Sequence, residues 1–159
     1  MKIIKNKVLS VLLSVLLLFT ANGLTLTAYA DGTGTESNPY QISTAEQLQA
    51  INNNVSAHYI LTEDIDLTGV DFTPIGNADS GAFTGSFDGN GHTISNLNVF
   101  SGKYAGLFGC NEGVIQNVML SEIYVYGTRY LGGVVAENTA LGVVSDCVVQ
   151  SGVVESDGG

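Results

Sequence analysis

The sequence has 159 residues, of which 45% are hydrophobic and 13% are charged. Fifteen acidic residues stand against five basic ones, which gives a formal net charge of −10. A surface this acidic repels nucleic acid and anionic membranes, which excludes both as partners. The acidic residues are spread along the chain and form no run. This pattern is typical of a solubilising surface, and cation binding is the alternative.

Residues 1–30 have the three parts of a secretory signal peptide. Three lysines precede an apolar run from Val8 to Phe19, and Ala28-Tyr29-Ala30 is a small-x-small cleavage site. The apolar run is shorter than the roughly 20 residues that span a bilayer, which argues against a membrane anchor. We expect cleavage between Ala30 and Asp31 and no membrane span afterwards. The chain after cleavage would contain two basic residues, Lys103 and Arg129, and fifteen acidic ones, which gives it a formal net charge of −13.

The next elements predict an N-terminal cap over residues 31–75, made of a strand, a helix and a strand. Pro39 to Ile42 is expected to be a short edge strand, where a proline is tolerated. A helix is expected over Ser43 to Asn52, because Ser43 and Glu46 form a capping box ahead of an apolar stripe. His58 to Leu67 alternates apolar and polar residues, as expected of one half-buried strand.

A phrase in the middle of the chain occurs twice. Tyr104 to Asn111 reads YAGLFGCN, and Tyr130 to Asn138 reads YLGGVVAEN, starting 26 residues later. A repeat of this length is one supersecondary unit that cannot bury its own apolar face. We therefore predict stacked solenoid coils over residues 76–159, continuing beyond Gly159, with glycines where the chain bends or approaches another backbone. The structural positions of the phrase are Tyr104, Gly106, Gly109, Asn111, Tyr130, Gly132, Gly133 and Asn138.

A shorter motif, apolar-x-Asn/Asp-apolar, begins at Ile94, Ile115 and Val144. The apolar residues of the motif can point inward, while Asn or Asp occupies a corner and bonds nearby backbone or a neighbouring coil. We interpret the three occurrences as one corner repeated in successive coils. Asn117 and Asp146 are corner residues in this interpretation.

The two cysteines, Cys110 and Cys147, show no metal-ligand spacing. In the alignment of the repeats Cys110 matches Ala136 and Cys147 matches Val118. Because both matching residues are small or apolar, we expect two buried free thiols, with a disulfide as the alternative.

The second phrase, Tyr130 to Asn138, resembles the GLUG repeat of bacterial surface proteins. Earlier segments, including Thr73 to Gly76 and Phe83 to Ile94, resemble those that commonly precede such repeats. The resemblance implies an all-β, right-handed parallel β-helix with a short N-terminal capping helix, in a bacterial protein that is secreted or held at the cell surface. Family members include adhesin-like proteins and non-catalytic forward regions of secreted enzymes, among them immunoglobulin-A-cleaving metallopeptidases. The chain departs from the pattern at Gly106, where two glycines are expected, and at Ala136, where a glycine usually stands.

Two polar clusters offer chemistry, and each has a structural alternative that we favour. The segment Asp88 to His92 places a carboxylate beside a histidine, as acid–base chemistry requires, but Asp-Gly and Asn-Gly are strong tight-turn signals. Asp64 and Asp66, with Glu63 and Asp71 nearby, could ligate calcium, but their spacing lacks the glycine and terminal glutamate of a calcium loop. An inverting pair of carboxylates stays open, because the sequence selects no pair. We expect no catalytic residue, metal or cofactor.

Tyr124 and Tyr126 alternate along one expected strand and therefore share a face. On a solvent face they would form an aromatic platform for a sugar ring or a protein, but core packing is the interpretation that we favour. The chain is thus predicted to be a non-catalytic module with an adhesin-like binding role or a spacer role. Its expected partners are a host or matrix protein or a glycan, besides further coils of its own chain. The alternative is the non-catalytic N-terminal region of a secreted peptidase or of a polysaccharide-degrading enzyme.

Overall fold

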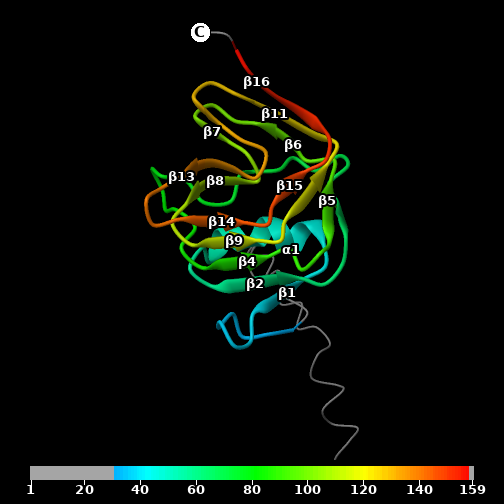
Figure 1. Ribbon diagram of the computed structural model, residues 1–159, viewed down its shortest axis with the longest axis vertical. Coiled ribbons are helices and arrows are strands. Elements are labelled where there is room, and N and C mark those ends of the chain that lie inside the picture. The colour runs from blue at the N-terminus through cyan, green and yellow to red at the C-terminus, as the bar shows by residue number, and fades with distance from the viewer. Residues whose placement is uncertain (1–30, 158–159) are drawn as a thin grey trace, which may run out of the picture.

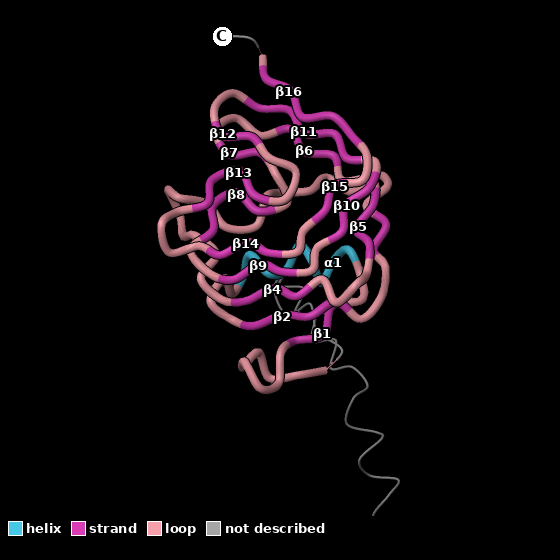
Figure 2. The backbone as a smooth tube through the Cα atoms, viewed as in Figure 1, coloured by secondary structure: helices cyan, strands magenta, loops and turns pink. Residues whose placement is uncertain are grey.

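The computed structural model describes residues 31–157, so the expected signal peptide and Ala30 lie outside the described residues. Short strands separated by loops wind into a parallel β-solenoid of about 4 turns with one short helix (Figures 1 and 2). Every pair of named strands is parallel, because each strand lies on the equivalent strand of the next coil. The all-β parallel solenoid predicted from the doubled phrase is confirmed.

The strands form three larger sheets and two smaller ones. The first sheet has the order β1 (Tyr40–Ile42), β2 (His58–Leu61), β4 (Ser86–Asp88), β9 (Val114–Gln116) and β14 (Val143–Ser145). The second has the order β15 (Val148–Val149), β10 (Met119–Ser121), β5 (Thr93–Ser95) and β3 (Ile65–Asp66). The third has the order β16 (Gly152–Ser156), β11 (Ile123–Gly127) and β6 (Asn98–Phe100). The smaller sheets pair β12 (Tyr130–Leu131) with β7 (Tyr104–Ala105), and β13 (Val135–Asn138) with β8 (Phe108–Asn111).

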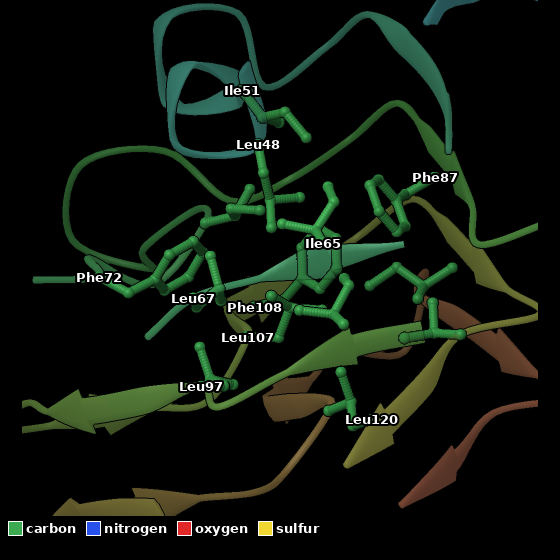
Figure 3. Packing of buried hydrophobic residues seen from close by; sticks show 14 of the residues in the cluster. Leu48, Ile51, Ile65, Leu67, Phe72, Phe87, Leu97, Leu107, Phe108 and Leu120 are labelled. Atoms are coloured by element: carbon green, nitrogen blue, oxygen red, sulfur yellow. The ribbon is translucent and has the colours of Figure 1, made fainter. Parts of the chain in front are cut away.

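The core consists of inward side chains that stack from coil to coil. The three-residue strands β4, β5, β6, β9 and β10 each bury only their middle residue, because successive side chains of a strand point to opposite faces. In the second sheet Ile65, Ile94 and Leu120 stack in register and are all buried. Phe108 packs against Phe87 with ring centres 5.4 Å apart (Figure 3). Burial of this continuous apolar column is the main favourable contribution to stability.

The helical segment starts two residues later than predicted, at Ala45, and ends one residue later, at Asn53. The α-helix α1 spans Ala45–Gln49 and continues as a 3-10 helix, η1, over Ala50–Asn53. Thr44 is the N-cap, since its hydroxyl accepts from the Gln47 backbone N–H, and the Gln47 side chain accepts from the Ser43 N–H. The predicted Ser43–Glu46 capping box is therefore wrong, because Gln47 supplies the reciprocal bond. The apolar stripe is confirmed, and its leucine and isoleucine point into the core (Figure 3).

The single strand predicted over His58 to Leu67 is two strands, β2 and β3, in different sheets. The alternation itself is correct, since Tyr59, Leu61, Ile65 and Leu67 are all buried and the two aspartates are exposed. A corner between Leu61 and Ile65 separates the strands, because one side of a coil holds only a few residues.

The three apolar-x-Asn/Asp-apolar motifs do not lie at one corner. Asn117 follows β9 and Asp146 follows β14, and the Asn117 backbone N–H donates to Ser145 O at 3.2 Å. Asn96 follows β5, one corner further along the coil, and its backbone N–H donates to Ser121 O. The interpretation as one repeated corner is therefore wrong for Ile94, whose register partners are Ile65 and Leu120.

The three motifs do share one backbone conformation. Asn96, Asn117 and Asp146 have φ values of 57°, 54° and 53°. Among non-glycine residues Asn and Asp are the ones that visit this left-handed region most readily. Their placement at corners is therefore confirmed.

The last described coil leaves its apolar residues exposed. Val144, Val149 and Val154 continue the inward columns of the three larger sheets, yet each is about two-fifths exposed, at 39%, 44% and 44%. Leu120, which pairs with Val149, is fully buried. The difference arises because no coil among the described residues covers β14, β15 and β16 (Figure 1).

Candidate functional site

The outer face of the third sheet carries three neighbouring aromatic side chains. Along β11 the burial alternates, with Ile123 and Val125 inside and the half-buried Tyr124 and Tyr126 outside. The favoured prediction, that these two tyrosines pack in the core, is therefore wrong. They face solvent, as a binding platform requires.

Phe100 of β6 completes this group and was missed in the sequence. It pairs in register with Tyr126, and its ring centre lies 5.5 Å from that of Tyr124 and 6.0 Å from that of Tyr126. Phe100 is 68% exposed. The alternation of Asn98, Val99 and Phe100 could have placed it outside, but a large apolar residue on a solvent face runs against the usual pattern. We call Phe100, Tyr124 and Tyr126 the aromatic face.

Polar groups border the aromatic face. The Tyr124 hydroxyl donates to the Glu155 carboxylate of β16, and this hydrogen bond raises the pKa of Tyr124. Asn98, in register with Tyr124, is exposed on the same side. Aromatic surface with hydrogen-bonding groups at its border is suited to ligands that are both apolar and hydroxylated.

A corner next to the aromatic face brings together the two basic residues of the described chain. Tyr104 and Tyr130 pair in register and stack, with ring centres 5.1 Å apart and planes 6° from parallel. Lys103 Nζ lies 4.7 Å from the centre of the Tyr104 ring, and the Arg129 guanidinium carbon lies 5.1 Å from that of Tyr130. Both are cation–π contacts. We call Lys103 and Arg129 the cationic corner.

The two cations differ in their partners. Lys103 Nζ donates to both carboxylate oxygens of Asp79, at 3.1 and 3.2 Å. Its hydrogen bonds to Tyr104 and then to Asp79 raise the pKa of Lys103. Among residues 31–157 Arg129 forms no ion pair and is exposed.

The glycines of the doubled phrase lie where backbones approach closely. A Cβ on Gly106 would lie 2.6 Å from the carbonyl oxygen of Gly132, and one on Gly132 would overlap that of Val135. A Cβ on Gly109 would meet the Gly76 carbonyl, and one on Gly133 would meet the side chains of Val149 and Ile123. The asparagines that end the two phrases, Asn111 and Asn138, hydrogen-bond to one another.

The segment Asp88 to His92 forms a turn between β4 and β5. The Asn90 N–H donates to Asp88 Oδ1 at 2.8 Å, and Asn90 has φ 51°. Burial opposes ionisation of Asp88, but donors from Asn117, Gln116 and Asn90 outweigh it and lower the pKa of its carboxyl group. The predicted turn is confirmed, and the Asp88 carboxylate is held by amides rather than by His92.

The carboxylate beside His92 belongs to Asp64, on the preceding coil. His92 Nδ1 lies 3.3 Å from Asp64 Oδ1, which also accepts the Thr93 N–H at 2.9 Å. The Thr93 N–H, and secondly His92, hold the pKa of Asp64 below its usual value. Asp66 accepts from Thr68 and from the Asn96 amide, so the two aspartates have separate partners.

A groove of about 590 Å³ runs along the outer face of the first sheet. His58 Nδ1 and Ser86 Oγ lie 2.8 Å apart there, on neighbouring strands, and Asp88, Glu112 and Gln116 also line it. A serine nucleophile needs its histidine oriented by a third group. Among residues 31–157 no carboxylate bonds His58, so this pair lacks that group.

The two cysteines are free, and only Cys110 lies in a strand. Cys110, in β8, is buried, and Cys147, before β15, is half-buried and donates to Ser145 O. Burial raises the pKa of both thiols. Both thiols are free as expected, but the prediction that both are buried is wrong for Cys147. Cys110 pairs with Glu137 in β13, however, so the alignment with Ala136 is wrong by one residue.

No family model matches the chain. Two longer proteins are similar to it. Halomucin of Haloquadratum walsbyi is 38% identical over 152 residues, which is 86% of this chain and 2% of halomucin. A protein of Evansella cellulosilytica, provisionally named a Gly-rich membrane protein, is 36% identical over 138 residues, which is 78% of this chain and 16% of the relative. The chain therefore spans a small part of each relative's length.

The fold also resembles a solved structure. The crystal structure of a candidate immunoglobulin A1 protease from Bacteroides ovatus matches with a TM-score of 0.63 and 26% identity, covering 74% of this chain and 39% of that one. Surface-type proteins and a protease candidate are thus what the chain resembles. Within residues 31–157 the helical segment is too short to cross a membrane.

Proposed function

We propose that this chain is an extracellular, non-catalytic β-helical module that binds a partner through its aromatic face, in the manner of an adhesin. The observation that carries the proposal is the exposure of Phe100 beside Tyr124 and Tyr126. A solenoid places its function on an extended surface, and aromatic side chains supply the largest contact area per residue. The similarity to halomucin and to a Gly-rich membrane protein supports a location at the cell surface.

The purified protein is tested on a glycan array and in pull-downs of extracellular matrix proteins. The double variant Phe100→Ala/Tyr126→Ala is expected to weaken binding at least about tenfold, since buried aromatic contacts are commonly worth more than 1 kcal/mol each. Val143→Thr is the matched control, because Val143 is exposed on a different sheet. If Val143→Thr lost binding and the double variant did not, the binding site would lie outside the aromatic face. No binding to any glycan or matrix protein would leave the spacer role.

The absence of catalysis has its own test. The purified protein is incubated with peptide and glycan libraries, and no cleavage is expected. Cleavage that persists after repurification would contradict the proposal, and the His58–Ser86 groove would be the first place to mutate.

A second candidate is the non-catalytic N-terminal region of a secreted peptidase. The likeness to the Bacteroides ovatus protease candidate favours it. The DNA that encodes this chain in its source organism distinguishes the two candidates. A downstream His-Glu-x-x-His helix would favour the peptidase, and further glycine-rich repeats with a wall anchor would favour the adhesin.

A further inference from the structure

The distribution of positive charge is uneven in this acidic protein. Lys103 and Arg129 are the only lysine and arginine among residues 31–157, and they lie on neighbouring coils at one corner. The Tyr130 N–H donates to Lys103 O at 2.8 Å, which stacks the two segments directly. Like charges at neighbouring positions repel each other. Asp79 forms an ion pair with Lys103 only, so the Arg129 guanidinium is the positive charge that can pair with an external anion.

This corner adjoins the aromatic face. Lys103 follows Phe100 by three residues in one coil, and Arg129 follows Tyr126 by three residues in the next. Three residues span at most about 10 Å even when fully extended. The Cα atoms of Tyr126 and Arg129 therefore lie within about 10 Å of one another, a separation that a ligand of one or two rings and the arginine side chain can bridge together.

We propose that the aromatic face and the cationic corner together bind a sugar that carries a carboxylate, such as a hexuronic or sialic acid. This inference rests on the function proposed above and names its ligand class. The aromatic rings take the apolar face of the sugar ring, and Asn98 bonds its hydroxyls. The planar guanidinium of Arg129 pairs with the ligand carboxylate through two parallel hydrogen bonds, a geometry that lysine cannot match.

The negative charge of the rest of the protein does not prevent this. At physiological ionic strength exposed charges more than about 8 Å apart are largely screened. The groups within that distance of the ligand carboxylate decide its binding. The charged groups that border the site are the two cations and two carboxylates, Asp79, which pairs with Lys103, and Glu155, which accepts from Tyr124. Arg129 is the one cation of the site without a carboxylate partner among residues 31–157.

The test compares acidic oligosaccharides with their own neutral forms. Hexuronic acid and sialyl oligosaccharides are each measured against the same molecule with its carboxyl groups reduced to alcohols, by calorimetry on the purified protein. We expect at least one acidic form to bind about tenfold more tightly than its reduced form, the effect of one charge-assisted hydrogen bond. Arg129→Gln should remove that preference, and Arg129→Lys should keep part of it.

A double variant separates local charge from net charge. Arg129→Gln/Glu63→Gln keeps the original net charge, because it removes one positive and one negative charge. Glu63 is suitable because it is exposed and distant in sequence from the corner. It should bind the acidic form as weakly as Arg129→Gln alone, and recovery of binding would overturn the role of Arg129.

The outcomes also separate this inference from the proposed function. Equal binding of acidic and reduced sugars, or binding of a matrix protein and no sugar, overturns the acidic ligand and leaves the binding module standing. Binding of no sugar and no matrix protein overturns both.

Discussion

The Asn111 side-chain amide donates to the side-chain oxygen of Asn138 at 2.8 Å, which joins equivalent positions of two coils. Asn111 is fully buried, and its oxygen accepts the Gly113 N–H at 3.0 Å, while Asn138 in turn donates to Gly142 O. A buried asparagine is stabilising only when its polar atoms are satisfied, and these bonds satisfy them. The recurrence of asparagine at the end of the doubled phrase thus has a structural cause.

Replacing Asn111 should therefore destabilise the fold more than replacing Asn138. Asn111→Ala leaves the buried Gly113 N–H without its partner, which costs about 1–3 kcal/mol. Asn138→Ala affects an exposed residue, and its expected cost is about 1 kcal/mol. Urea denaturation followed by circular dichroism measures both. Equal losses of unfolding free energy in the two variants would show that burial of Asn111 does not strengthen the contribution of its hydrogen bonds.

A second comparison uses two register partners with different burial. Leu120 is fully buried, and Val149 of the next coil is 44% exposed. Leu120→Ala should cost about 2–5 kcal/mol, the usual range for a core leucine. Val149→Ala should cost about 0.5 kcal/mol or less, as for exposed positions. If the cost at Val149 approached that at Leu120, then the last coil is covered in solution.

Acid should destabilise the protein through Asp66. The Thr68 hydroxyl, the Asn96 amide and the Thr68 N–H hold the pKa of Asp66 below its usual value. Its ionised form therefore stabilises the fold above an unfolded-state pKa of about 3.9, and this stabilisation is lost as the pH falls through the lower folded-state pKa. Asp66→Asn should make the loss of stability in acid less steep. Asp71→Asn, at another exposed aspartate, controls for the removal of one charge.

The cysteines should differ in reactivity. Burial raises the pKa of both thiols, which reduces the reactive thiolate. Cys147 is half-buried and Cys110 is buried, so an aromatic disulfide reagent should modify Cys147 first and Cys110 only slowly. In denaturant both should react at once. Fewer than two thiols per denatured chain would instead support the disulfide.

The sequence was sufficient for the solenoid and for most inward residues. The doubled phrase required stacked coils, and strict alternation from Tyr59 to Leu67 assigned the buried side correctly although the strand is broken. Ser43 and Thr44 both carry hydroxyl groups, and only the contacts of Gln47 show that Thr44 is the N-cap.

Other features depend on contacts that no sequence spacing reveals. Coil length is not constant: Tyr130 lies 26 residues after its partner Tyr104, but Glu137 lies 27 after Cys110. An alignment at constant spacing therefore slips by one residue at Cys110. The aromatic face was found only in part, because Phe100 is a large apolar residue on the outside and only its contacts with the tyrosines distinguish it from a core residue.

The change in coil length continues at the next corner, where Val143 pairs with Val114, 29 residues earlier. The extra residues enter at the corners, near Gly133 and between Asn138 and Val143, while the strands on either side stay aligned. Such a framework can accept short insertions at its corners without shifting the core. New loops, tags or binding segments would be grafted most safely at the exposed Leu141, between the bonded residues Asn138 and Gly142 and far along the chain from the aromatic face on β6 and β11.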